Sequence, residues 1–107
     1  MRVYISGPIT GTNDFEQRFA AAETKLKAQG FEVFNPSKIN LVLPDSATWE
    51  DCMKLCEAML GCCDTIYMLR DWEKSRGAMK EYHLAMAADM IVLRQYEEKE
   101  QSDDKEE

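Results

Sequence analysis

Short apolar runs alternate along the chain with longer segments in which apolar residues recur every three or four positions. The runs cover residues 2–6, 31–34, 65–69 and 90–93. They are rich in β-branched and aromatic residues and have the length of buried strands. The pattern therefore predicts four strands separated by helices.

The segments between these runs predict amphipathic helices. The first follows Asn13, which can cap it, and carries an apolar stripe at Phe15, Phe19, Ala22 and Leu26. The second is expected over about 49–60, after a cap at Ser46 or Thr48, and the third starts after a cap at Ser75. Strands and helices in strict alternation, joined by right-handed crossovers, give a parallel sheet with helices on both faces. We predict an α/β protein with a flavodoxin-like or Rossmann-like three-layer fold and a small parallel sheet of four to five strands.

Charge is concentrated at the end of the chain. Residues 97–107 hold seven acids and two lysines, out of 20 acids and 13 bases in the whole sequence of 107 residues. They contain no apolar side chain, so we expect one domain over residues 1–96 and a disordered acidic tail over 97–107. The almost neutral domain argues against a nucleic-acid polymer as partner, because phosphate backbones are bound by excess positive charge. No apolar run is long enough to span a bilayer and no signal peptide is visible, so we expect a cytoplasmic protein without membrane contact.

Four cysteines and one histidine offer little support for a metal site. Cys52 and Cys56 are one helical turn apart, Cys62 and Cys63 are adjacent, and the sequence has no Cys-x-x-Cys motif. We therefore expect no metal, and reduced cysteines that are buried as small apolar residues. His83 falls off the apolar stripe of its helix and is expected at the surface.

The most informative polar residue is Glu81. In the helix after Ser75 it shares with Ala78, Tyr82 and Ala85 a stripe that should face the protein. A buried carboxylate must be paired, hydrogen-bonded or shifted in pKa, and such groups concentrate in functional clefts. Three interpretations stay open: a paired structural glutamate, a helix whose stripe is rotated so that Glu81 reaches solvent, or a functional glutamate beside a ligand for which its small neighbours leave room.

In open parallel sheets, ligands bind beyond the carboxyl ends of the strands. Segments 7–13, 35–37 and 70–76 arrive there. The first has neither the Gly-x-Gly-x-x-Gly fingerprint nor the Gly-Lys-Ser/Thr ending of a P-loop, so no NAD or ATP, and no other cofactor, is indicated. Ser75, Arg76 and Gly77 could hold a phosphate or a sugar hydroxyl at the start of the third helix, or Ser75 could be a cap alone.

Several short motifs, taken in order, resemble the nucleoside 2-deoxyribosyltransferase-like superfamily. They are Tyr4-Ile5-Ser6-Gly7-Pro8, Asn35-Pro36-Ser37, Cys63-Asp64 before a strand, and Trp72-x-x-Ser75-x-Gly77-Ala78-x-x-Glu81-x-x-x-Ala85. The resemblance is closest to the short DUF4406 branch of phage and bacterial proteins. It covers the chain from residue 1 to about residue 93 and rests on the order and spacing of the motifs.

This resemblance implies cleavage or transfer at the N-glycosidic bond of a nucleoside, a deoxynucleoside or a nucleoside 5′-monophosphate. Glu81 would be the nucleophile that attacks the anomeric carbon. The residues expected to bind the substrate are Tyr4, Gly7, Pro8, Asp71, Ser75 and Gly77, with Ser75 and Gly77 at a 5′-phosphate. Related proteins complete their sites with a residue from a neighbouring subunit, so a homodimer is expected.

The sequence departs from the superfamily at two positions. Active relatives carry an aspartate where this chain has Cys56, and a thiol is a poor acid for protonating a departing base. Asp51 and Asp71 are the candidates to replace it. Nucleotide-hydrolysing relatives have a phosphate-binding arginine where this chain has Thr10, and Arg76 is a candidate to compensate.

Two functions therefore compete. The first is an enzyme that acts on N-glycosidic bonds. The second, motivated by Cys56, is a nucleotide- or nucleoside-binding module that keeps the pocket without turnover. A third, an interaction protein that uses the surfaces of Trp49 and Trp72, is disfavoured because tryptophans more often line cores or pockets.

Overall fold

The computed structural model describes residues 1–9 and 11–95 of the chain. In chain order its elements are β1 (Arg2–Ser6), α1 (Phe15–Ala28), β2 (Glu32–Phe34), the 3-10 turn η1 (Pro36–Lys38), α2 (Ile39–Val42), α3 (Trp49–Leu60), β3 (Thr65–Met68), the 3-10 turn η2 (Trp72–Lys74), α4 (Arg76–Ala87) and β4 (Ile91–Arg94). The predictions about Thr10, about the domain end at residue 96 and about the acidic tail over 97–107 lie outside the described residues.

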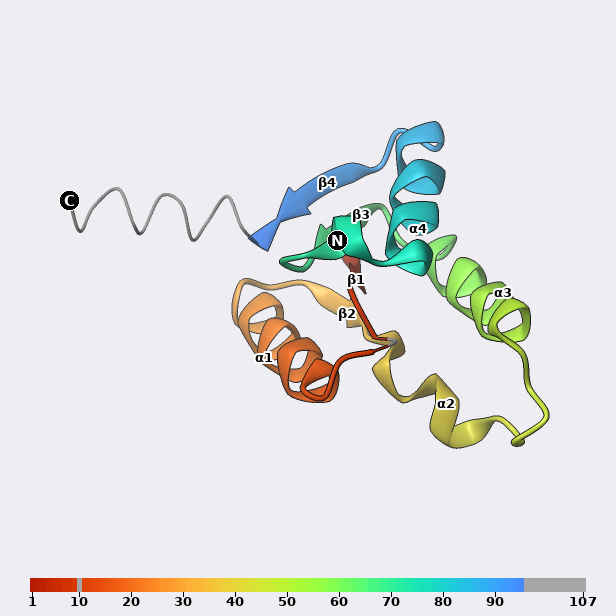
Figure 1. Cartoon of the computed structure of the whole chain (residues 1–107). Helices are drawn as coiled ribbons and strands as arrows, with labels where there is room; N and C mark the ends of the chain where they lie inside the picture. Colours follow the sequence, from red (N-terminus) through yellow and green to blue (C-terminus); the bar gives the residue numbers. More distant parts are fainter. Residues whose placement is uncertain (10, 96–107) are drawn as a thin grey trace.

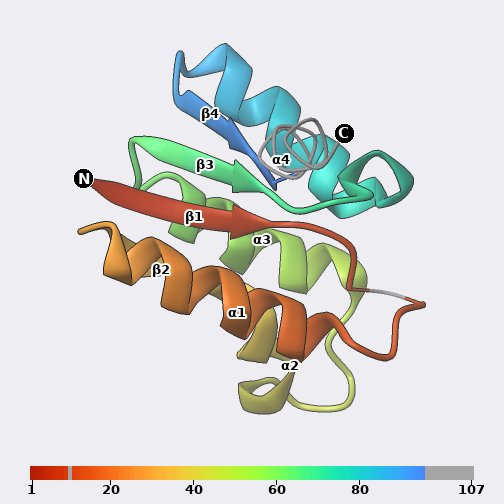
Figure 2. The same cartoon turned by 90° about the vertical axis from the view of Figure 1, so that its left-hand side faces the viewer.

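The four strands form one parallel sheet in the order β2-β1-β3-β4. In the register of this sheet, Tyr4 of β1 lies opposite Phe34 of β2 and Ile66 of β3. Figure 2 shows β1, β3 and β4 running in the same direction. The strand order reverses between β1 and β3. After β1 the chain adds β2 on one side of β1, and it then crosses back to add β3 and β4 on the other side. The predicted α/β fold with a small parallel sheet is confirmed, with four strands.

Helices cover both faces of the sheet, with α1 on one side and α3 and α4 on the other (Figure 1). The alternation of side chains along a strand explains this arrangement. Val3 and Ile5 of β1 pack with Phe19 and Leu26 of α1, whereas Tyr4 packs on the side of α3 and α4. The two central strands are almost completely buried, as is usual for parallel sheets, and the predicted three layers are confirmed.

Capping residues define where the helices begin. The Thr48 hydroxyl accepts a hydrogen bond from the Asp51 amide at 3.1 Å, and the Asp51 carboxylate accepts one from the Thr48 amide at 2.9 Å. This capping box starts α3, so Thr48 rather than Ser46 is the cap. Asp14 occupies the cap position of α1 without a capping side-chain hydrogen bond, so the prediction that Asn13 caps this helix is wrong.

The segment between β2 and α3, where the apolar pattern predicts neither a strand nor a helix, contains η1 and α2. Pro36 starts η1, and the side-chain oxygen of Asn35 accepts a hydrogen bond from the Ser37 amide at 2.9 Å. Single turns of this kind have no apolar repeat that a sequence pattern could reveal. The strands β2 and β4 each start one residue later than predicted. The amides of Phe31 and Met90 donate hydrogen bonds to carbonyls in the last turns of α1 and α4, so these two residues end the helices rather than begin the strands.

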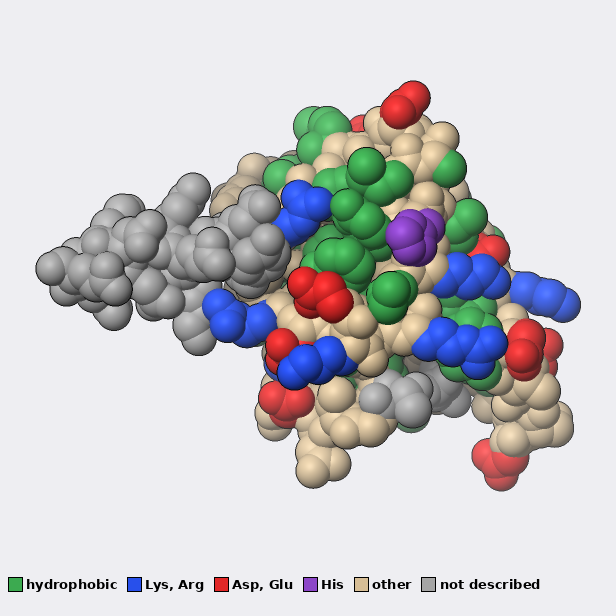
Figure 3. Space-filling model, turned by 45° about the horizontal axis from the view of Figure 1, so that its top comes forward, with side chains coloured by type: hydrophobic (Ala, Val, Ile, Leu, Met, Phe, Trp, Pro, Cys, Tyr) green, Lys and Arg blue, Asp and Glu red, His purple; other side chains and the backbone are tan. Residues whose placement is uncertain are grey.

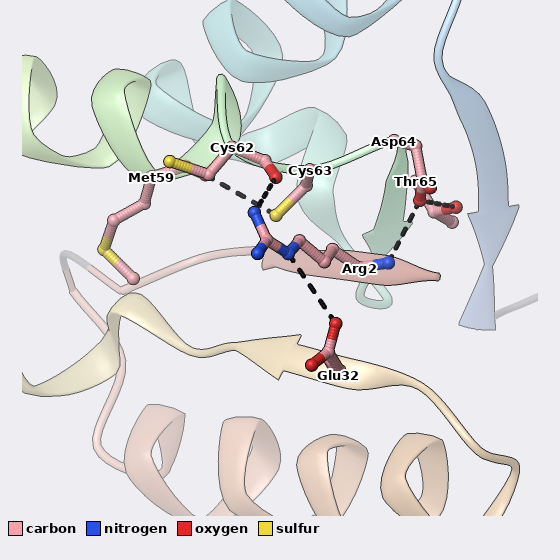
Figure 4. Close-up of polar contacts among 7 residues, drawn as sticks. All are labelled: Arg2, Glu32, Met59, Cys62, Cys63, Asp64 and Thr65. Carbon is pink, nitrogen blue, oxygen red and sulfur yellow. Dashed lines mark hydrogen bonds and ion pairs between the residues drawn. The ribbon is translucent and has the colours of Figure 1, made fainter.

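Polar contacts join three strands at their amino ends (Figure 4). The Arg2 guanidinium donates a hydrogen bond to the Cys62 carbonyl at 3.3 Å and lies 3.6 Å from a carboxylate oxygen of Glu32. The Arg2 amide and the Thr65 hydroxyl both donate to the Asp64 carboxylate. These contacts tie the amino ends of β1, β2 and β3 together, and a cavity lies beyond the opposite, carboxyl end of β1.

The four cysteines are free, as predicted, but they are not uniformly buried. Of the four, only Cys56 is buried, and Cys62 is exposed because it lies in the turn after α3. His83 is exposed on α4, as predicted. Within the described part of the chain, none of the helices has both the length and the apolar character needed to cross a membrane.

Candidate active site

Glu81 lies on the buried stripe of α4. Ser75 caps this helix, and its hydroxyl accepts a hydrogen bond from the Ala78 amide at 3.2 Å. Ala78, Glu81 and Ala85 are buried at helical spacing, and Tyr82 is half-buried beside them. The predicted stripe is confirmed, and Glu81 is only 5% exposed.

Two hydroxyl groups of β1 hold the Glu81 carboxylate. Tyr4 donates a hydrogen bond to Oε2 and Ser6 donates one to Oε1, both at 2.6 Å. Tyr4 and Ser6 are two positions apart on one strand, so both side chains point to the face that α4 covers. Hydrogen bonds of this length are typical of a charged oxygen acceptor. Both oxygens of the carboxylate are therefore fixed in place.

The surroundings of Glu81 determine its acidity. Among the described residues it has no ion-pair partner. Burial raises the pKa of Glu81, and the hydrogen bonds from Ser6 and Tyr4 act in the opposite direction. Burial, followed by the Glu81 charge, raises the pKa of Tyr4 well above its ordinary value. Tyr4 is therefore a hydrogen-bond donor to the carboxylate rather than a source of protons at neutral pH.

Glu81 lines a cavity of about 520 Å³ beyond the carboxyl end of β1. Trp49, Met53 and Cys56 contribute to its wall from α3, and Ser37 contributes from η1. The volume is in the range of small-molecule sites. The cavity also lies next to the reversal of strand order, which is where open parallel sheets bind ligands.

Six of the predicted site residues meet at this cavity, and three others are not among its described lining residues. Those that line it are Tyr4, Gly7, Ser75, Arg76, Gly77 and Glu81, and those that do not are Pro8, Asp51 and Asp71. Asp51 is engaged in the capping box of α3, where hydrogen bonds from Thr48 lower its pKa, so it is charged near neutral pH. Asp71 lies in the left-handed backbone region at the start of η2, 3.9 Å from the Lys74 ammonium.

Further lining residues are absent from the predicted site. Ser6 could be found from the strand alternation, because it is two positions after Tyr4 on β1. Lys74 and Trp49 also line the cavity, and the guanidinium carbon of Arg76 lies 3.9 Å from the centre of the Trp49 ring. A contact of this kind between separate helices has no local sequence signal.

Cys56 lies beside Tyr4 and Glu81, at the position where the resemblance implies an aspartate. Burial raises the pKa of this thiol to about 11. The thiol is therefore protonated throughout the physiological pH range. Among the described lining residues, Glu81 is the only carboxylate.

Gly7, which follows β1, lies so close to Leu69, which follows β3, that there is no room for a side chain at position 7. A Cβ atom added at Gly7 would lie 2.7 Å from Cβ and 2.8 Å from Cδ1 of Leu69. Leu69 is fully buried, so it has little room to move away. We expect Gly7→Ala to lower the free energy of unfolding by about 1–3 kcal/mol, as measured by urea denaturation.

Gly61→Ala is the matched control for this variant. A Cβ atom added at Gly61 would meet only backbone oxygens, at 3.5 Å, and the backbone φ of −63° suits any residue. We expect no comparable loss of stability in the control. Equal unfolding midpoints for the two variants would contradict the crowding argument at Gly7.

Similarity to known proteins agrees with this architecture. The model of a family described as "Domain of unknown function (DUF4406)" matches residues 1–94. No curated protein is matched by the chain. Among solved structures, a 2-deoxyribosyltransferase from the psychrotolerant bacterium Bacillus psychrosaccharolyticus superposes with a TM-score of 0.71 and is 16% identical in sequence. The superposition covers 88% of this chain and 71% of that one, and it establishes a shared fold.

Proposed function

The chain belongs to the DUF4406 family, and from the geometry of its cavity we propose that it cleaves or transfers at the N-glycosidic bond of a nucleoside or nucleoside 5′-monophosphate. The observation that carries this proposal is the position of Glu81. Its carboxylate is buried, is held at both oxygens and lines a cavity of small-molecule size. The fold shared with a 2-deoxyribosyltransferase supports the same class of chemistry.

Glu81 is the nucleophile in this proposal. Its carboxylate attacks the anomeric carbon while the bond to the base breaks, and its negative charge stabilises the oxocarbenium character of the transition state. The product is a glycosyl ester on Glu81, which water or a second base then resolves. Tyr4 and Ser6 hold the carboxylate, so it loses little freedom when it attacks.

Positive charge at the start of α4 favours a 5′-phosphate on the substrate. Lys74 and Arg76 line the cavity together with Ser75 and Gly77. The amino end of the helix adds backbone donors and a favourable dipole for an anion. Stacking on the Trp49 ring holds the Arg76 guanidinium, and we propose Arg76 as the phosphate-binding arginine of this site.

A catalytically impaired binding module of the same fold is the second candidate. Cys56 favours it, because the described lining residues include no carboxylic acid other than Glu81 that could protonate a departing base. Such a module would bind nucleosides or nucleotides without releasing the base.

A panel of nucleosides, 2′-deoxynucleosides and their 5′-monophosphates separates the two candidates. Release of free base, or exchange of one base for another, is detected by liquid chromatography. Turnover that disappears in Glu81→Gln supports the enzyme. Binding measured by calorimetry without release of base supports the module, and the absence of both binding and turnover contradicts both.

We also propose that the protein forms a homodimer. Figure 3 shows hydrophobic side chains gathered on the face that α4 presents. The large exposed apolar residues of α3 and α4 are Leu55, Met79, Leu84 and Met86. Pairing with a second copy would remove such a patch from water. We expect the wild-type protein to sediment as a dimer and Met79→Lys/Met86→Lys as a monomer, and a wild-type monomer at micromolar concentration would contradict this.

A further inference from the structure

The cavity around Glu81 has no described group suited to protonating a departing base. Glu81 is the only carboxylic acid among its described lining residues. Cys56 and Tyr4 keep their protons at neutral pH, because burial raises the pKa of Cys56 to about 11 and that of Tyr4 well above its ordinary value. The other protic side chains among the described lining residues carry a further thiol, serine hydroxyls, an indole N–H, an ammonium and a guanidinium. Groups of these types are poor general acids for a nitrogen base near neutral pH.

The need for an acid depends on the charge of the base. A neutral base leaves as an anion unless it is protonated, and general acid catalysis contributes about 10²–10⁴-fold to such reactions. A base that already carries a positive charge on its glycosidic ring system leaves as a neutral molecule. It needs no proton from the protein.

We propose that this site acts on N-glycosides whose base is positively charged, namely pyridinium nucleosides or N7-alkylated purine nucleosides. The inference rests on the proposed function and names the substrate class of the same site. It also removes the conflict between a well-placed nucleophile at Glu81 and a thiol at Cys56, because the reaction uses the first and does not need an acid at the second.

The distribution of charge in the cavity fits such a substrate. Glu81 is buried, and among the described residues the groups that hydrogen-bond to its carboxylate are all neutral, namely the hydroxyls of Tyr4 and Ser6 and the thiol of Cys56. A buried negative charge without a cationic partner is costly. A positively charged base, bonded to the carbon that Glu81 attacks, supplies the missing partner. Lys74, at the end of η2, and Arg76, at the start of α4, are exposed and match a 5′-phosphate on the same substrate.

The step balances without an acid. A carboxylate oxygen of Glu81 forms a bond to C1′, the bond between C1′ and the ring nitrogen breaks, and its electron pair stays on that nitrogen. The base thereby becomes neutral and departs. Water then attacks C1′, its proton passes to the solvent, and the carboxylate is regenerated. The net reaction converts the cationic nucleoside and water into a neutral base, the free sugar and a proton.

Matched pairs of substrates that differ in the charge of the base test this inference. One pair is 7-methylguanosine and guanosine, and the other is nicotinamide riboside and its neutral dihydro form, each as nucleoside and as 5′-monophosphate. Each rate with the wild-type protein is divided by the uncatalysed rate, so that the greater intrinsic lability of the charged compound cancels. We expect the resulting acceleration to be at least about 100-fold greater for the charged member of a pair. A difference confined to one pair identifies which kind of charged base is the substrate.

The outcomes separate this inference from the proposed function. Accelerations that differ by less than about 100-fold in both pairs, and that disappear in Glu81→Gln, overturn the inference and leave the proposed function intact. No turnover of any compound contradicts the proposed function and the inference with it.

Cys56→Asp provides a second test, because it places a carboxylic acid beside Glu81. We expect it to raise the turnover of guanosine relative to 7-methylguanosine by about tenfold or more. An unchanged ratio in a folded variant counts against the inference. If this variant does not fold, the substrate pairs with the wild-type protein decide the question.

Discussion

Glu81→Gln is expected to slow the release of base from any accepted substrate on the order of 10⁴-fold. An amide has nearly the same shape as the carboxylate but cannot form the glycosyl ester or stabilise the oxocarbenium-like transition state by its charge. Tyr4 and Ser6 can each still hydrogen-bond to the side chain, so the fold should persist. Single-turnover kinetics followed by liquid chromatography measure the effect.

Glu57→Gln is the matched control. It removes a carboxylate of α3 that lies 3.0 Å from the Lys80 ammonium and is not among the described lining residues of the cavity. We expect its turnover to stay within a few-fold of the wild-type value. Equal losses in the two variants would point to a general effect of charge and would contradict the assignment of Glu81 as nucleophile.

Stability gives an independent check that Glu81→Gln is folded, and its sign follows from burial. Burial raises the pKa of Glu81, so the folded state binds the proton more tightly than the unfolded state, where the pKa is about 4.3. The stability that Glu81 contributes is fully present below that value and is lost as the pH rises through the folded-state pKa. Glu81→Gln lacks this loss, so urea denaturation should show it gaining stability over the wild type toward neutral pH.

Tyr4→Phe is expected to lower kcat/KM at neutral pH by about 10- to 100-fold, because a hydrogen bond to a charged group contributes about 1.5–3 kcal/mol. Removal of the hydroxyl leaves Oε2 of the buried carboxylate without this donor. The pKa of Glu81 then rises further, and a smaller fraction of the protein carries the ionised nucleophile. The pH–rate profile should therefore move its rising limb to higher pH.

Tyr82→Phe is the control for this variant. It removes a hydroxyl on the same helix as Glu81, but this hydroxyl accepts a hydrogen bond from the Arg94 guanidinium at 3.1 Å. We expect its pH–rate profile to match that of the wild type. A Tyr4→Phe protein with the wild-type profile would show that Tyr4 does not tune the acidity of Glu81.

The sequence predicts the layers of the fold and the orientation of Glu81 because both depend on local periodicity. The stripe of Ala78, Glu81 and Ala85 follows from the helical repeat, and the cap at Ser75 fixes where that repeat starts. The hydrogen-bond partners of Glu81 are a different matter. Tyr4 and Ser6 are 77 and 75 positions away in the sequence, and only the position of β1 inside the sheet brings them to α4.

Asp51 shows a second limit of sequence analysis. An aspartate near the start of a helix is equally suited to a catalytic site and to a capping box, and residue type alone does not distinguish them. In the structure, the Asp51 carboxylate accepts a hydrogen bond from the Thr48 amide, as part of the capping box. The contact of Arg76 with Trp49 could not be predicted from the sequence either, because it depends on how α3 and α4 pack rather than on either segment alone.

The long separation between Glu81 and its two hydroxyl donors links catalysis to folding. β1 pairs with both β2 and β3, so detachment of this one strand divides the sheet and removes both donors together. An intermediate that retains α4 without β1 keeps the carboxylate but has no assembled site. Enzymatic activity therefore reports on the cooperative formation of the complete sheet, and it should vanish together with that sheet during denaturation.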